Sequence, residues 1–95
     1  MITVRWTETM KEGREAEAVK VLKEAMEPQK YPIRICTCRT EPSNTIAMEI
    51  DYESLAEYEK AVAEWQTTEQ AAVFGKKWPE LVCGNEAHEV WNLAE

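Results

Sequence analysis

His88 is the only histidine of the chain, so any acid–base step that needs an imidazole falls to it. It belongs to a predicted last strand, where it would stand near Arg5 and Glu49 and could serve as a general base. A single histidine on a strand is more often a hydrogen-bonded structural residue. His88 is therefore the candidate catalytic residue, with a structural role as the alternative.

Large apolar side chains recur at strand and helix spacings, and four of them are tryptophans, a high number for 95 residues. If these side chains face one another between a sheet and its helices, they would line a pocket for a small apolar or aromatic molecule. The alternative is a solid aromatic core. Gly75 and Pro79 favour a pocket, because they loosen the segment that would cover it. The candidate ligand-binding residues are Trp6, Met48, Tyr58, Trp65, Phe74, Trp78 and Trp91.

The three cysteines, Cys36, Cys38 and Cys83, are an odd number in a chain with enough apolar residues to fold without disulfides. Cys36 and Cys38 are two residues apart on a strand, which is unfavourable for a disulfide. A zinc site would need Cys83 and His88 to converge on them. We therefore expect reduced thiols in a cytoplasmic protein, with no metal and no cofactor.

The net charge of -7 lies almost wholly in the second half, where residues 48–95 carry three Lys or Arg against eleven Asp or Glu. An acidic chain without a basic cluster is a poor ligand for nucleic acids and anionic membranes. The sequence contains no long apolar run and no Rossmann, P-loop, HExxH or GxSxG pattern, which excludes the usual motif-bearing nucleotide-binding and hydrolase classes.

The elements that must position these residues are clearest in residues 45–65. Apolar and polar residues alternate from Ile46 to Tyr52, as in a strand with one buried face. Ser54 and Glu57 then form a capping-box pattern, which predicts that a helix begins at once and continues to Trp65.

The rest of the chain supplies the remaining elements. Strands are predicted at residues 2–7, 33–40 and 86–93, and a helix at residues 14–26. Residues 67–82 have helical spacing, but Gly75 weakens that helix and Pro79 should stop or kink it. Residues 83–85 are predicted to form a turn.

The order strand, helix, strand, strand, helix, strand predicts one ferredoxin-like α+β domain over residues 1–95. Four antiparallel strands would carry the helices on one face, with the first and third strands in the centre. In the favoured register Trp91 lies on the helix side and His88 on the open face, although one β-bulge would reverse this. The open face mixes apolar residues with charges of both signs, as a face between two copies would. Its candidate dimer residues are Arg5, Arg34, Cys36, Glu49 and Asp51.

The element order, with AMEIDYESLAEYEKAVAEW across the strand-to-helix junction and a closing HEVWNL strand, resembles the dimeric α+β barrel superfamily. Within it the chain looks most like NIPSNAP-like domains, on the strength of residues 54–58. The resemblance implies that two sheets pair face to face as a homodimeric barrel. It also implies either an enzyme without a cofactor, a monooxygenase or an isomerase, or a protein without assigned activity. Haem-degrading relatives use a helical axial ligand, which His88 on a strand does not match.

Two functions remain open from the sequence. One is a homodimer that binds a small apolar or aromatic molecule and acts on it as a monooxygenase or isomerase without a cofactor. The other is a non-catalytic interaction or structural module, whose acidic second half would contact a basic partner.

Overall fold

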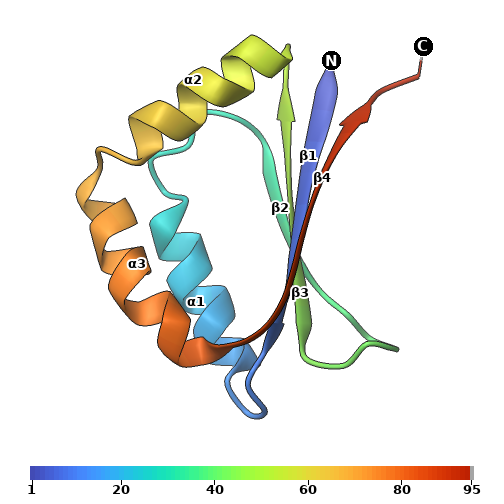
Figure 1. The fold of residues 1–95 in the computed structure, drawn as a ribbon, viewed down its shortest axis with the longest axis vertical. Coiled ribbons are helices and arrows are strands. Elements are labelled where there is room, and N and C mark those ends of the chain that lie inside the picture. The colour runs from blue at the N-terminus through green and yellow to red at the C-terminus, as the bar shows by residue number, and fades with distance from the viewer. Residues whose placement is uncertain (95) are drawn as a thin grey trace.

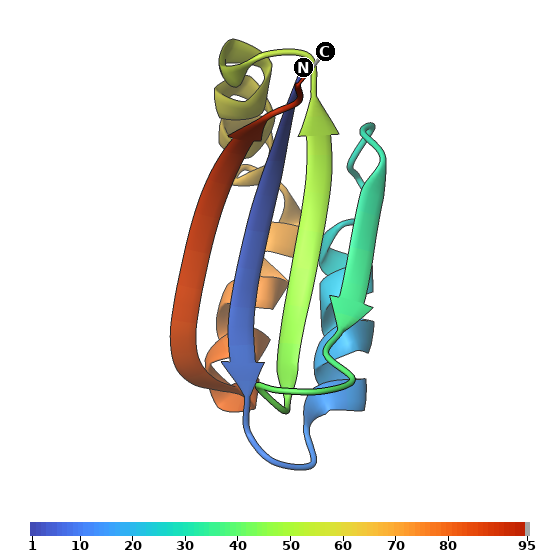
Figure 2. The same ribbon diagram turned by 90° about the vertical axis from the view of Figure 1, so that its right-hand side faces the viewer.

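The sheet of the computed structural model, which describes residues 1–94, has the strand order β2-β3-β1-β4 (Figure 2). Its strands are β1 (Ile2–Met10), β2 (Ile33–Thr37), β3 (Thr45–Tyr52) and β4 (Val82–Asn92). Every neighbouring pair is antiparallel, and the first and third strands form the centre. This confirms the predicted ferredoxin-like α+β fold.

Three helices, α1 (Glu15–Ala25), α2 (Leu55–Trp65) and α3 (Glu69–Leu81), all lie on one side of the sheet, and the other side is bare (Figure 1). Apolar side chains on alternate positions of β1 and β3 face the helices and form the core with α1 and the end of α3. Ile46, Met10 and Leu22 are almost completely buried in it. The core therefore lies between the two central strands and the helical layer.

The junction between β3 and α2 matches the prediction closely. The Ser54 hydroxyl accepts a hydrogen bond from the Glu57 backbone N–H at 3.2 Å and caps the first turn of α2. At the other end of this helix, the Trp65 indole N–H donates to the Ala25 carbonyl at 2.9 Å. The cap and this bond fix where α2 begins and where its last turn lies against α1.

Residues 69–81 form one continuous helix, although Pro79 was expected to stop or kink it. Pro79 lies in the last turn of α3, where the only backbone hydrogen bond that it removes is the one to the Gly75 carbonyl. Gly75 is exposed, so water can satisfy that carbonyl, and the cost of the proline is small. The Thr68 hydroxyl accepts from the Ala71 N–H at 3.2 Å and begins the helix.

The last strand begins four residues earlier than predicted, and the expected turn at residues 83–85 is a bulged part of it. Gly84 and Asn85 have φ values of 128° and 58°, and the pairing with β1 shifts register between Thr7 and Met10. Beyond the bulge Trp6 pairs with His88 and Thr3 pairs with Trp91. The favoured register of this strand was therefore wrong: His88 faces the helices and Trp91 the open side.

Candidate functional site

The space between the helical layer and the sheet contains a cavity of ≈ 260 Å³, which we call the helix-side cavity. For comparison, a cavity of about 150 Å³ is enough to hold benzene. Its wall is mostly apolar and includes six of the seven predicted ligand-binding residues, namely Trp6, Met48, Tyr58, Trp65, Phe74 and Trp78. The aromatic side chains thus border an open space, as the pocket hypothesis requires, and do not fill it.

Four aromatic side chains form one side of the cavity. Phe74 stacks on Trp78 with ring centroids 4.8 Å apart and an interplanar angle of 26°. Trp6 lies 5.5 Å from Trp78 at a tilt of 49°. Trp65 meets Phe74 edge to face at 5.8 Å. Rings held against one another in this way present flat, rigid surfaces to a planar ligand.

Glu8 is the buried polar group of this cavity. Its side chain is on the helix-facing side of β1, and the residue is only 6% exposed. The Trp78 indole N–H donates to Glu8 Oε1 at 2.9 Å. Burial raises the pKa of the Glu8 carboxyl above its usual 4.5, the bond from Trp78 lowers it, and the negative charge of Glu86 raises it further.

Tyr58 and His88 stand at the more exposed part of the cavity wall. The Tyr58 hydroxyl is 3.4 Å from His88 Nε2, and the two rings are perpendicular. Tyr58 also packs on Tyr52, whose pKa burial raises to about 12, so that its hydroxyl stays protonated. His88 was expected beside Arg5 and Glu49, which is wrong because the bulge places it on the opposite side of the sheet.

Trp91 is the one predicted ligand-binding residue outside the cavity. It is 54% exposed on the open side of β4, an edge strand. The prediction missed two carboxylates of the cavity wall, Glu8 and Glu86, and also Gln29. Glu8 could have been found, because it continues the alternation of Ile2, Val4 and Trp6 and so had to face the helices.

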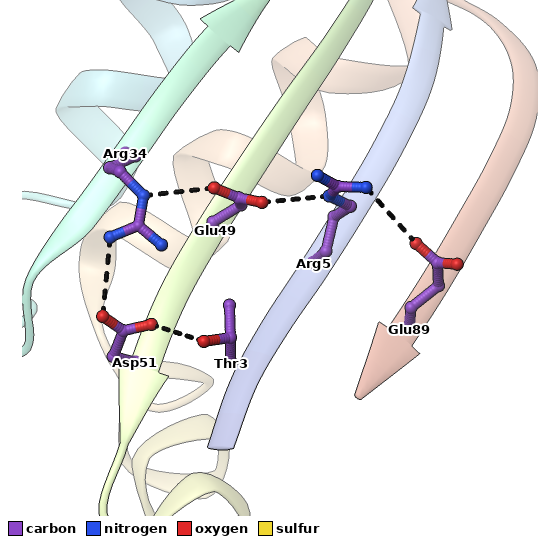
Figure 3. A network of polar contacts seen from close by, with 6 residues as sticks. All are labelled: Thr3, Arg5, Arg34, Glu49, Asp51 and Glu89. Carbon is purple, nitrogen blue, oxygen red and sulfur yellow. Dashed lines mark hydrogen bonds and ion pairs between the residues drawn. The ribbon is translucent and has the colours of Figure 1, made fainter. Parts of the chain in front are cut away.

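The open face carries a chain of ion pairs across all four strands (Figure 3). Glu49 accepts from Arg5 at 3.0 Å and from Arg34 at 3.1 Å, and these bonds hold its pKa below the usual value. Asp51 is bonded by Thr3 at 2.7 Å and by Arg34 at 3.5 Å, which lowers its pKa as well. Four of the five predicted dimer residues, namely Arg5, Arg34, Glu49 and Asp51, take part in these ion pairs. The fifth, Cys36, is exposed on the same face opposite Ala47.

The three cysteines are free, and Cys36 and Cys83 are exposed. Within residues 1–94, no three side chains of the His, Cys, Asp and Glu types are grouped so that they could hold a metal ion. None of the helices described over this range is long and apolar enough to cross a membrane.

Solved structures with the same fold include NIPSNAP domain proteins. One from Burkholderia xenovorans is 13% identical, covers 99% of this chain and 95% of its own, and has a TM-score of 0.86. A NIPSNAP family protein from Agrobacterium tumefaciens is 16% identical over 100% of this chain and 89% of its own, with a TM-score of 0.85. A putative antibiotic biosynthesis monooxygenase from Nitrosomonas europaea is 8% identical, covers both chains completely and has a TM-score of 0.75.

No family model matches the sequence, and no curated protein matches it. At these identities the structural likeness establishes the fold alone. The chain has a NIPSNAP-like, ferredoxin-type fold, as the resemblance of its sequence implied.

Proposed function

We propose that this protein is a homodimeric α+β barrel that binds a small apolar or aromatic molecule in the helix-side cavity. The observation that carries the proposal is the cavity itself, an open space of ≈ 260 Å³ bordered by Trp6, Phe74 and Trp78. A close-packed core would have no such space, because interiors pack about as densely as organic crystals. The volume suits a molecule of one or two fused rings.

Binding of naphthalene, followed through the tryptophan indole N–H signals in ¹H–¹⁵N NMR spectra, tests this proposal. Naphthalene should shift the Trp6 and Trp78 signals saturably. Val62 lines the cavity, whereas Val73 of α3 does not line it and is 41% exposed. Val62→Trp should fill the space and abolish binding, whereas Val73→Trp should leave binding intact. Absence of saturable shifts in the wild-type protein would overturn the proposal.

The second copy belongs on the open face. The ion pairs of Arg5 and Arg34 with Glu49 and Asp51 are satisfied within one chain, which lowers the cost of covering them. Beside them Trp91 is 54% exposed, and Leu93 and Met1, joined by a backbone hydrogen bond of 3.1 Å, are also about half exposed. An exposed tryptophan beside paired charges is typical of the centre of an interface.

Sedimentation velocity tests the dimer. The wild-type protein should sediment with the mass of two chains at micromolar concentration, and Trp91→Ser should weaken association about 30-fold or more, as expected for a hot-spot residue. Val73→Ser also replaces an exposed apolar side chain by serine, but on α3, and should leave the dimer unchanged. A monomeric wild-type protein would contradict this part of the proposal and leave the cavity untouched.

The monooxygenase and isomerase reactions that the resemblance implies would both take place in the same cavity, with His88 and Tyr58 at its wall for acid–base steps. The name of the N. europaea structure supports monooxygenation as the first reaction to test. We place the protein in the cytoplasm, in keeping with three free cysteines. A non-catalytic interaction module is the alternative, and it predicts no saturable binding of naphthalene.

A further inference from the structure

Glu8 places a buried carboxylate in the wall of a mostly apolar cavity. Its Oε1 accepts the indole N–H of Trp78, but its Oε2 makes no hydrogen bond or ion pair with another side chain among residues 1–94. No fully buried side-chain oxygen or nitrogen in that range lacks a partner, so Oε2 must be reached from the cavity. A hydrogen-bond acceptor therefore opens into the ligand space.

Packing alone does not explain this residue. To satisfy the Trp78 N–H, a neutral amide would serve as well and would avoid the cost of burying a charge. The side chains that line the cavity include no Lys or Arg, and the other carboxylate among them, Glu86, is of like charge. A buried carboxylate kept without a cation, at a concave site, is more typical of a functional group than of a stabilising one.

We propose that Glu8 orients the ligand: its Oε2 accepts a hydrogen bond from a hydroxyl group on an aromatic molecule whose rings lie against Trp6, Phe74 and Trp78. This inference rests on the proposed function and adds the chemical class of the ligand. It is a neutral hydroxylated aromatic compound of one or two rings. Glu8 and Glu86 repel a ligand carboxylate, so aromatic acids are excluded.

The bond depends on the protonation of Glu8, which Trp78 from α3 and Glu86 from β4 influence directly. Tyr52 from β3, Tyr58 from α2 and His88 from β4 are the other titratable groups of the wall. The ionised carboxylate accepts a stronger, charge-assisted bond than the protonated group does. Preference for a hydroxyl group should therefore fall as the pH decreases through the pKa of Glu8, which lies above 4.5.

The test compares 2-naphthol, naphthalene and 2-naphthoate, with the Trp78 indole N–H signal as the reporter next to Glu8. The wild-type protein should bind 2-naphthol about tenfold more tightly than naphthalene at neutral pH, and 2-naphthoate least tightly. In Glu8→Gln, the amide oxygen keeps the Trp78 bond and an N–H₂ donor replaces Oε2. This variant should bind 2-naphthol and naphthalene about equally and should bind 2-naphthoate better than the wild-type protein does.

Three controls separate the explanations. Glu80→Gln, an exposed change on α3, should keep the wild-type order of the three compounds. Glu86→Gln and His88→Gln should each keep the preference for 2-naphthol and its loss at low pH, which shows that neither residue is its source. If Glu8→Gln does not fold, the pH dependence in the wild-type protein decides the matter.

The outcomes distinguish this inference from the proposed function. If naphthalene and 2-naphthol bind with equal affinity at every pH, the cavity binds aromatic molecules but Glu8 does not orient them. Glu8 is equally ruled out as the orienting group if Glu8→Gln keeps the wild-type order of the compounds. If none of the three compounds binds, the proposed function itself fails, and this inference fails with it.

Discussion

The Tyr58 hydroxyl lies 3.4 Å from His88 Nε2, a contact that joins α2 to β4 across the wall of the helix-side cavity. These residues are 30 positions apart in the chain, and only the bulge near Gly84 brings His88 to this side of the sheet. The contact is long and partly exposed, so it orients two side chains without contributing much to stability.

Tyr58→Phe tests whether the ring of Tyr58, and not its hydroxyl, contributes to stability and to ligand binding. The phenylalanine keeps the packing on Tyr52, so the free energy of unfolding should change by less than about 0.5 kcal/mol and naphthalene affinity should not change. Tyr58→Ala removes the wall and should cost about 1–3 kcal/mol and weaken naphthalene binding. Urea denaturation and NMR titration measure the two quantities. Leu55→Ala, on the exposed side of the same helix, is the control. If Tyr58→Phe and Tyr58→Ala lowered stability and naphthalene affinity equally, the hydroxyl and not the ring would be the contributing group.

Glu8→Gln should stabilise the protein more at pH 8 than at pH 4. The pKa of Glu8 is raised in the folded state, so the protonated form is favoured on folding, and that contribution is lost as the pH rises through the folded pKa. Glutamine stays neutral at every pH and avoids this loss. Urea denaturation of both proteins between pH 4 and pH 8 gives the difference, with Glu80→Gln as the control. A difference independent of pH would show that Glu8 titrates alike in the folded and unfolded states.

Glu49→Gln should show the opposite pH dependence. Arg34 and, next, Arg5 lower the pKa of Glu49, so its contribution is present above the unfolded value of 4.5 and is lost as the pH falls through the folded pKa. Because both arginines are about half exposed, the variant should lose less than about 1 kcal/mol at pH 7. High salt should shrink that loss. Urea denaturation in a Trp91→Ser background reduces any contribution from dimerisation, and a loss no smaller at pH 3 than at pH 7 would contradict the assignment.

Local sequence patterns predicted the helices and strands correctly where a short-range effect, such as burial of one face or capping, determines the conformation. The alternation from Ile46 to Tyr52 and the Ser54 cap gave the bounds of β3 and the start of α2, because burial of one face and backbone donors at a helix start act within a few residues. Six side chains of the cavity followed from the same patterns. The cavity volume did not follow, since it depends on how α2 and α3 sit against the sheet.

The facing of β4 could not be read from its own residues. Val90 and Trp91 are both about half exposed, so burial gives this edge strand no clear apolar face. What decides the facing is the bulge at Gly84 and Asn85, which looks like an ordinary turn in the sequence. One extra residue there moves His88 into the cavity wall and Trp91 out of it.

A pair of glycine substitutions tests that bulge. Gly84 has a φ of 128°, which residues with a side chain rarely adopt, whereas Gly75 lies within α3. A Cβ at either position would meet nothing within 4 Å, so backbone conformation alone decides the effect. Gly84→Ala should destabilise the fold by about 1–3 kcal/mol, and Gly75→Ala should stabilise it by about 0.5–1 kcal/mol. Urea denaturation gives both values. If Gly84→Ala left the free energy of unfolding unchanged, the bulge would not depend on a glycine at this position. The packing of His88 and Trp91 themselves would then determine the side of the sheet on which each lies.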